Sequence, residues 1–229
     1  MRGGLIGTGR SADVFEYGEG KVLRRYRNAR DTDGEVAVME HARAHGYPAP
    51  AARALSGTDI VMDRIEGMTM LDDLGRRPWR IDQHARTLAA LHRRLQGIPA
   101  PDWLPAPVGE GRALLHLDLH PDNVILTAGG PFVIDWPNAA RGPAGADVAH
   151  TWLVLACSTP TTGAYRQALS IAGRKIFLRL FLRHCDRSDA LVHLGAAGAY
   201  RLANRTLPRS ELEAIGGLLD RVTPRPDAP

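Results

Sequence analysis

The sequence predicts an α+β protein with two lobes, and three observations lead to that prediction. The first third of the chain reads as short strands joined by glycine turns, with one helix among them. From residue 68 the apolar spacing becomes helical. The 229 residues are 44% hydrophobic, which is enough for a core. We therefore expect an N-terminal lobe over residues 1–67, with a small antiparallel sheet and one helix, and a mainly helical C-terminal lobe over residues 68–229.

The strands of the first lobe are predicted from apolar runs on either side of glycine turns. Gly7–Ala12 forms one such turn, and Gly18–Gly20 forms a tighter one. A helix over 33–45 has its apolar residues at helical spacing and is stopped by Gly46 and Pro48. The expected strands cover residues 5–7, 13–17, 21–26, 52–55 and 59–62.

In the second lobe the clearest element is a helix over 82–96, whose apolar residues fall on one face. The three prolines of segment 100–107 indicate a loop. Short apolar runs separated by polar turns follow, and the chain beyond residue 147 reads as helices. These short runs cover residues 113–117, 124–126 and 132–134.

Composition excludes several classes of protein. The longest strongly apolar run without a charge, 151–157, is far shorter than the roughly twenty residues that a membrane helix needs. The N-terminus lacks the apolar stretch of a secretion signal, and two cysteines form no disulfide framework. The arginines are scattered and aromatic residues make up 6%, which disfavours a nucleic-acid partner. We expect a cytoplasmic monomer or weak homodimer with no membrane partner.

The segment that carries chemistry is His116-Leu-Asp-Leu-His-Pro-Asp-Asn123, followed by Phe132-Val-Ile-Asp-Trp136. It presents Asp118, Asn123 and Asp135 from polar turns between apolar runs. Phosphoryl transfer needs a carboxylate to position and deprotonate the acceptor, and an amide oxygen and a second carboxylate to hold Mg²⁺. These residue types stand in the order and spacing of a kinase catalytic loop.

On these motifs the chain resembles the aminoglycoside phosphotransferase and choline kinase group of protein-kinase-like phosphotransferases. The resemblance covers residues 5 to about 157. It implies a bilobal protein-kinase-like fold, with ATP or GTP as cosubstrate and Mg²⁺ as cofactor. It also implies that Asp118 is the catalytic base, that Asn123 and Asp135 are catalytic metal ligands, and that Asp147 is a structural aspartate behind the site.

A metal-dependent hydrolase is an alternative for the same segment. His116, Asp118 and His120 could lie on one strand face and bind a divalent metal. That interpretation leaves Asn123 and Asp135 without a role. In the kinase interpretation, His116 orients the loop and His120 packs or binds a backbone carbonyl.

The resemblance places nucleotide-binding residues in the first lobe. Gly7 and Gly9 would let the backbone close over phosphates, because neither has a Cβ. Ser11 could donate a hydroxyl to a phosphate oxygen, and an ordinary turn serine is an equal alternative. Met62 would border the adenine, with the Asp63 and Ile65 backbones as its hydrogen-bond partners. A plain linker predicts the same composition at 63–67.

The next strand departs from the family pattern, because an arginine stands where kinases place a lysine. Strand alternation puts Val22 and Arg24 on one face and Lys21 on the other. Val22 would face the adenine, and Arg24 would bind the phosphates. An arginine is always charged and can bind phosphate through two hydrogen bonds. This departure also motivates a second function class, a nucleotide-binding pseudokinase that acts as a sensor.

The partner of Arg24 should be a glutamate on the following helix, with Glu35 preferred over Glu40. A local alternative is as strong. Thr32-Asp-Gly-Glu35 matches a capping box, in which Glu35 would reach back to the Thr32 amide.

The acceptor is expected to be a small hydroxylated metabolite or antibiotic. The 136–146 segment has no Ser, Thr or Tyr, so it has no site for the phosphorylation that orders many protein kinases. Residues 141–229 hold twelve Lys and Arg against seven Asp and Glu. A polycationic aminoglycoside should be drawn to carboxylates, so this charge balance disfavours it as the acceptor.

Overall fold

The computed structural model describes residues 2–9, 11–158, 171–204 and 206–222. The chain divides into two units, one formed by residues 1–68 and 125–137 and the other by residues 69–124 and 138–229. The prediction placed one boundary after residue 67 and assigned every later residue to the second lobe, whereas the first stretch of unit 1 ends at Met68. Segment 125–137, which carries Asp135, belongs to the first unit.

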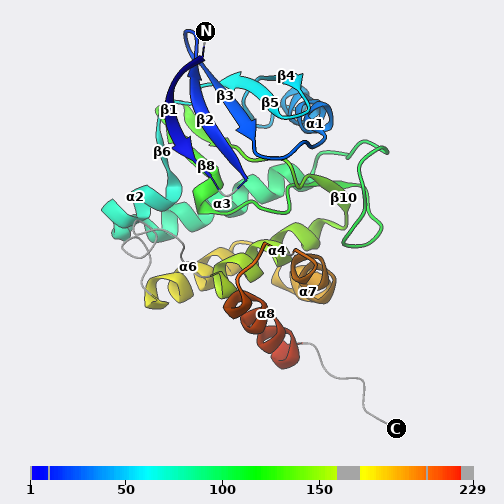
Figure 1. Cartoon of the computed structure of the whole chain (residues 1–229). Coiled ribbons are helices and arrows are strands. Elements are labelled where there is room, and N and C mark those ends of the chain that lie inside the picture. The colour runs from blue at the N-terminus through cyan, green and yellow to red at the C-terminus, as the bar shows by residue number, and fades with distance from the viewer. Residues whose placement is uncertain (1, 10, 159–170, 205, 223–229) are drawn as a thin grey trace. The chain divides into compact units, whose positions relative to one another are not determined.

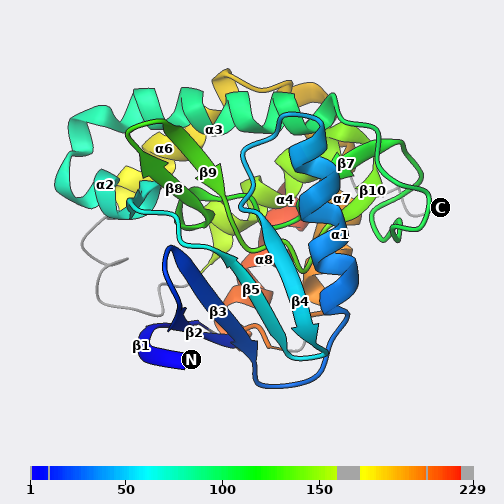
Figure 2. The same cartoon turned by 90° about the horizontal axis from the view of Figure 1, so that it is seen from above.

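Unit 1 is built on a five-stranded antiparallel sheet with the strand order β1-β2-β3-β5-β4. Helix α1, Thr32–Ala44, lies along β4 in both ribbon views (Figures 1 and 2). The side chain of Asp31 accepts a hydrogen bond from the Gly34 amide and caps this helix. The strands are β1 Arg2–Thr8, β2 Ala12–Tyr17, β3 Lys21–Tyr26, β4 Ala52–Ser56 and β5 Asp59–Asp63.

Strand register decides which residues face the core of unit 1. Val22 lies opposite Met62, and Arg24 lies opposite Ile60. Val22, Ile60 and Met62 are buried in one apolar cluster together with Tyr26. Because side chains alternate along a strand, Arg24 is on the same face as this cluster.

A second, three-stranded sheet has the order β6-β8-β9, with β6 at Met68–Thr69, β8 at Val124–Thr127 and β9 at Gly130–Val133. Gly67 is required here, because a Cβ on it would lie 2.2 Å from the Leu126 carbonyl oxygen. The Val133 amide also donates to the Pro48 carbonyl. These contacts explain why segment 125–137 belongs to unit 1.

Unit 2 is helical, and α4 packs against α3, α6, α7 and α8. The predicted amphipathic helix is confirmed as α3, Ile81–Gln96, whose buried face includes Ala85, Leu88, Leu91, His92 and Leu95. A short antiparallel pair joins β7 to β10. The elements are α2 Met70–Arg76, η1 Pro78–Arg80, β7 Ala113–Leu115, η2 Pro121–Asn123, β10 Ala140–Gly142, α4 Ala144–Cys157, α6 Ile171–Arg183, α7 Arg187–Leu202 and α8 Arg209–Val222.

Two strands differ from their predicted bounds for a physical reason, and one further strand was not predicted. Strand β1 begins at Arg2 rather than Leu5, since irregular pairing with β2 extends it through a glycine pair. Strand β7 ends at Leu115 rather than Leu117, because Leu117 has a positive φ of 52°. Strand β10 was not expected, since Ala-Arg-Gly has no alternating pattern.

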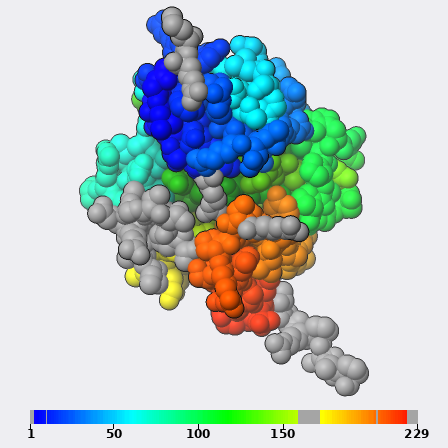
Figure 3. Space-filling view, in the orientation of Figure 1, coloured from blue at the N-terminus to red at the C-terminus, as the bar shows by residue number. Residues whose placement is uncertain are grey.

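The surface of unit 1 includes strand β1, shown dark blue in Figure 3, where Leu5 and Ile6 are 58% and 44% exposed. Across the described part of the chain, no helix combines the length and the apolar character needed to cross a bilayer.

Candidate functional site

In unit 2 the segment after β7 presents Asp118 from a conformation that few residues adopt. Leu117 has a φ of 52°, in the left-handed region, and its side chain is fully buried in an apolar cluster with Leu115 and Ala146. The Asp118 side chain is 25% exposed. Such a backbone costs about 1–3 kcal/mol and persists only where its surroundings hold it. The buried leucine therefore anchors the loop while the aspartate stays accessible.

Asp147 holds this loop from the first turn of α4. Its Oδ1 accepts hydrogen bonds from the backbone amides of His116 at 3.0 Å and Leu117 at 2.7 Å. Burial alone would raise the pKa of Asp147, but His92, His116 and the Leu117 amide lower it. This is the structural position that the sequence resemblance implied for Asp147.

Asn123 lies directly against Asp118. Its side-chain nitrogen donates to the Asp118 backbone carbonyl at 2.8 Å and to Asp118 Oδ2 at 3.2 Å. This orientation follows from the hydrogen bonds, since the two ends of an amide look alike in shape. With the nitrogen turned to Asp118, the amide oxygen is the atom that Asn123 can offer to a cation.

His120 has a role different from the one expected. Its Nδ1 accepts a hydrogen bond from the Asp122 amide at 3.3 Å and so caps η2, whereas packing or binding to a carbonyl was predicted. Its Nε2 lies 3.5 Å from Asp118 Oδ1. Burial would raise the pKa of Asp118, but His120, together with His150 and His116, outweighs that effect and holds the pKa well below its usual range. Asp118 is therefore ionised at neutral pH.

In unit 1, Arg24 links two carboxylates. Its Nη1 lies 3.3 Å from Glu35 Oε1, and its Nη2 donates to Asp135 Oδ1 at 2.5 Å. The Arg24 and Glu35 side chains are only 11% and 1% exposed. Burial would lower the pKa of Arg24, but Asp135 and Glu35 raise it. The structure thus contains the expected pair of Arg24 with Glu35 and adds Asp135 to it.

Glu35 is held by a second partner that sequence reasoning missed. The Tyr26 hydroxyl donates to Glu35 Oε2 at 2.6 Å, and the Arg24 guanidinium lies 4.7 Å from the Tyr26 ring centroid. Burial raises the pKa of Glu35 despite both partners. Strand alternation could have identified Tyr26, since it stands two residues beyond Arg24. The capping-box alternative is wrong, because Asp31 caps α1 and Glu35 turns to the sheet.

Asp135 also has a left-handed backbone, with a φ of 69°. The next residue, Trp136, is fully buried, donates its indole N–H to the Val133 carbonyl and meets Tyr47 edge-on. The buried tryptophan fixes the turn, and the Asp135 side chain remains 35% exposed beside Arg24. Among the described residues, Leu117 and Asp135 are the non-glycine residues with positive φ.

Of the predicted glycine turn, Gly7 lies in strand β1 opposite Val14, whereas Gly9 and Ser11 lie between β1 and β2, and residue 10 is outside the described residues. The Gly9 amide donates to the Ala12 carbonyl at 2.8 Å and closes the turn. Among the described residues, a Cβ on Gly7 would meet only Val14 Cβ, at 3.9 Å. The described structure therefore leaves room for a side chain at position 7.

The predicted adenine-binding residues lie at the end of β5 and just after it. Met62 is buried beside Val22. The Asp63 amide donates to the Ala51 carbonyl, and the Asp63 carboxylate accepts from Lys21 Nζ at 2.5 Å. In this structure the Asp63 amide is therefore not available to a nucleotide. Ile65 is half-buried in the following linker.

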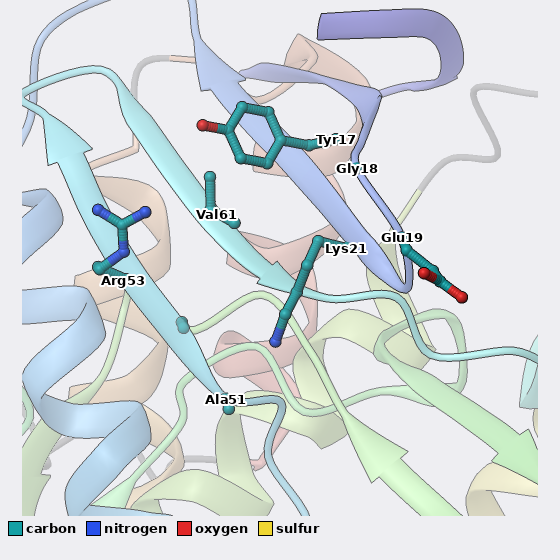
Figure 4. A pocket seen from close by; sticks show the side chains of 8 residues that line it. Tyr17, Gly18, Glu19, Lys21, Ala51, Arg53 and Val61 are labelled. Atoms are coloured by element: carbon teal, nitrogen blue, oxygen red, sulfur yellow. The ribbon is translucent and has the colours of Figure 1, made fainter. Parts of the chain in front are cut away.

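Figure 4 shows a pocket of about 320 Å³ in unit 1 that holds none of the predicted site residues. Lys21 and Val61 line it, and both alternate with residues of the Arg24 face. The pocket is thus on the opposite face of the sheet. Its lining residues are Tyr17, Gly18, Glu19, Lys21, Ala51, Ala52, Arg53 and Val61.

The hydrolase alternative finds no support in unit 2. Within residues 2–9, 11–158, 171–204 and 206–222, no three His, Cys, Asp or Glu side chains are grouped to hold a metal ion. His116 is fully buried, while Asp118 and His120 are partly exposed. The three residues therefore do not form the expected metal cluster.

Comparisons with solved structures identify the fold. ADP-bound aminoglycoside phosphotransferase APH(2'')-Ib aligns with 94% of this chain and 91% of its own, at 15% identity and a TM-score of 0.54. The GDP and kanamycin complex of APH(2")-IIia aligns with 95% of this chain and 91% of its own, at 14% identity and a TM-score of 0.55. A choline/ethanolamine kinase family protein from Mesorhizobium loti aligns with 99% of this chain and 88% of its own, at 14% identity and a TM-score of 0.60. This chain has their protein-kinase-like α+β fold.

Comparison with curated proteins found no match. The sequence profile of the phosphotransferase enzyme family, in contrast, matches residues 4–113 and 100–185, which is most of the chain. The matched residues include the segment from His116 to Asn123, Asp135 and Asp147. The chain therefore belongs to the phosphotransferase enzyme family.

Proposed function

We propose that this phosphotransferase transfers the γ-phosphoryl group of ATP or GTP to a hydroxyl group of a small metabolite or antibiotic, with Mg²⁺ as cofactor. Asp118 would accept the proton of the acceptor hydroxyl. Asn123 and Asp135 would hold the metal, which neutralises charge on the phosphates when bound. Arg24 would bind the phosphates, supported by Glu35, and the Gly7–Ser11 turn would cover them.

The observation that carries this proposal is the construction around Asp118. An ionised, accessible carboxylate follows a strained residue, and Asn123 donates to it. A purely structural aspartate would not need such a backbone. Asp135 and the Asn123 amide offer oxygen atoms, which are the ligands that Mg²⁺ prefers.

Nucleotide identity and acceptor class belong to the same proposal. One solved relative carries ADP and another carries GDP with kanamycin, so the proposal includes both ATP and GTP as phosphate donors. The excess of Lys and Arg over residues 141–229 favours an acceptor that is not polycationic. Val22 and Met62 would border the purine, with the Asp63 and Ile65 backbones beside it.

One observation favours a second candidate, a nucleotide-binding sensor without turnover. Arg24 occupies the position of the kinase lysine and is tied to Asp135, a proposed metal ligand. In this state the carboxylate that should meet the metal is neutralised by the protein itself. A sensor would bind nucleotide and transfer nothing.

The test is thermal unfolding with ATP or GTP, with and without Mg²⁺, followed by turnover assays on a panel of hydroxylated acceptors. Stabilisation by a triphosphate that grows with Mg²⁺, together with formation of nucleoside diphosphate, supports the kinase. Stabilisation without turnover on any acceptor favours the sensor. No stabilisation by either nucleotide would overturn both.

Arg24→Ala should weaken binding of the triphosphate more than binding of the bare nucleoside, because only phosphates lose a charged partner. The expected difference is about 1.5–3 kcal/mol, the scale of a hydrogen bond to a charged group. Arg24→Lys should keep most of the affinity, and turnover gained only in that variant would favour the sensor. Calorimetric titration with both ligands measures this difference.

The matched control is Arg25→Ala, on the same strand but on the opposite face. Arg25 binds Asp59 through two hydrogen bonds and so loses a pair of the same kind. Lys21→Ala, whose amine is paired with Asp63, is a second control. If either control weakens triphosphate binding and Arg24→Ala does not, the phosphates lie on the other face of the sheet.

A further inference from the structure

Two residues of α4, one helical turn apart, hold the backbone on both sides of Asp118. Asp147 accepts the two backbone amides that precede Asp118. The Thr151 hydroxyl donates to the carbonyl of Leu119, the residue that follows, at 2.7 Å. Residues four apart lie on one face of a helix, so a single rigid face contacts the loop twice.

His92, from α3, joins these two contacts. Its Nδ1 lies 3.1 Å from Asp147 Oδ2, and its Nε2 lies 3.2 Å from the Thr151 hydroxyl oxygen. The imidazole therefore lies between the two α4 residues that hold the loop, with one ring nitrogen against each of them.

The cluster of His92, Asp147 and Thr151 is buried. The His92 and Asp147 side chains are each 1% exposed, and Thr151 is fully buried. Apart from His150, the other buried positions of helix α4 are apolar or glycine. Buried polar groups cost free energy unless they are hydrogen-bonded, and an apolar residue would avoid that cost. The polar side chains therefore need a reason beyond packing.

We propose that Thr151 and His92 are positioning residues for phosphoryl transfer, which fix Asp118 by holding the carbonyl of Leu119. The catalytic part of this inference rests on the function proposed above for Asp118. Leu117 has a positive φ, and a strained backbone that is held on one side only can relax. The loop therefore has to be held on both sides of Asp118. A shift of about 1 Å in a reacting group can cost roughly 100-fold in rate.

The test compares Thr151→Val, which keeps the shape and removes the hydroxyl, with Thr151→Ser, which keeps the hydroxyl. Hydrogen–deuterium exchange of the 115–123 backbone should be faster in the valine variant. Its kcat should fall about 10- to 100-fold, with KM for the nucleotide within about twofold. Thr151→Ser should restore both. His92→Phe should change both in the same direction by a smaller factor, since Thr151 keeps its bond to Leu119.

Thr87→Val is the matched control, because the Thr87 hydroxyl donates only to the Gln83 carbonyl within its own helix. It should leave exchange of the loop and turnover unchanged. The inference is overturned if Thr151→Val changes neither measurement, or if Thr87→Val changes both equally. Exchange needs no turnover, so it decides separately whether Thr151 holds the loop. A wild-type chain inactive on every acceptor would instead overturn the proposed function.

Discussion

Replacing Asp118 by asparagine should lower kcat about 10²- to 10⁴-fold, the range that one general acid or base contributes. The carboxylate is ionised and a quarter exposed, so it can accept a proton that an amide cannot. Nucleotide affinity should stay within a few-fold, because the proposed phosphate ligands are other residues. Single-turnover kinetics and calorimetric titration of the nucleotide measure the two quantities separately.

Asp122→Asn makes the same substitution in the same loop and serves as the control. Asp122 is exposed, and its backbone amide, which the substitution keeps, makes the contact with His120. Its turnover should match that of the wild type. Near-normal turnover in Asp118→Asn would show that another group accepts the proton, and equal losses in both variants would indicate a general disturbance of the loop.

The short-range part of the candidate site could be predicted from the sequence. Strand alternation needs only neighbouring residues, so it correctly placed Val22 and Arg24 on one face and Lys21 on the other. Helical spacing located α3 to within one residue. Each of these inferences depends on local geometry that the residue order decides.

Contacts between distant residues could not be predicted in the same way. Arg24 and Asp135 are 111 positions apart, and their ion pair depends on the buried Trp136 turn as much as on either residue. In the sequence Thr151 is one polar residue in an apolar helix, and only the fold brings it to the Leu119 carbonyl. The residue that caps α1 is Asp31 and not Thr32 of the capping-box pattern, because the Thr32 hydroxyl donates to the Ser56 carbonyl.

The pairing of Arg24 with Asp135 gives a prediction with two opposite parts. If Asp135 binds Mg²⁺, the metal and Arg24 share one carboxylate. Removing that carboxylate then abolishes the metal response and also leaves a buried guanidinium with only Glu35 as its acidic partner. A triphosphate without metal would be the natural replacement for the lost negative charge.

Asp135→Ala should therefore reduce the stimulation of triphosphate binding by Mg²⁺ about tenfold or more, the scale of one lost charged contact. Triphosphate binding without metal should stay equal or become tighter. The control Asp59→Ala removes the partner of Arg25 on the opposite face and should change neither value. Calorimetric titration of nucleotide with and without Mg²⁺ gives both. An unchanged Mg²⁺ response in Asp135→Ala would exclude this carboxylate as a metal ligand, and weaker metal-free binding would exclude competition with Arg24.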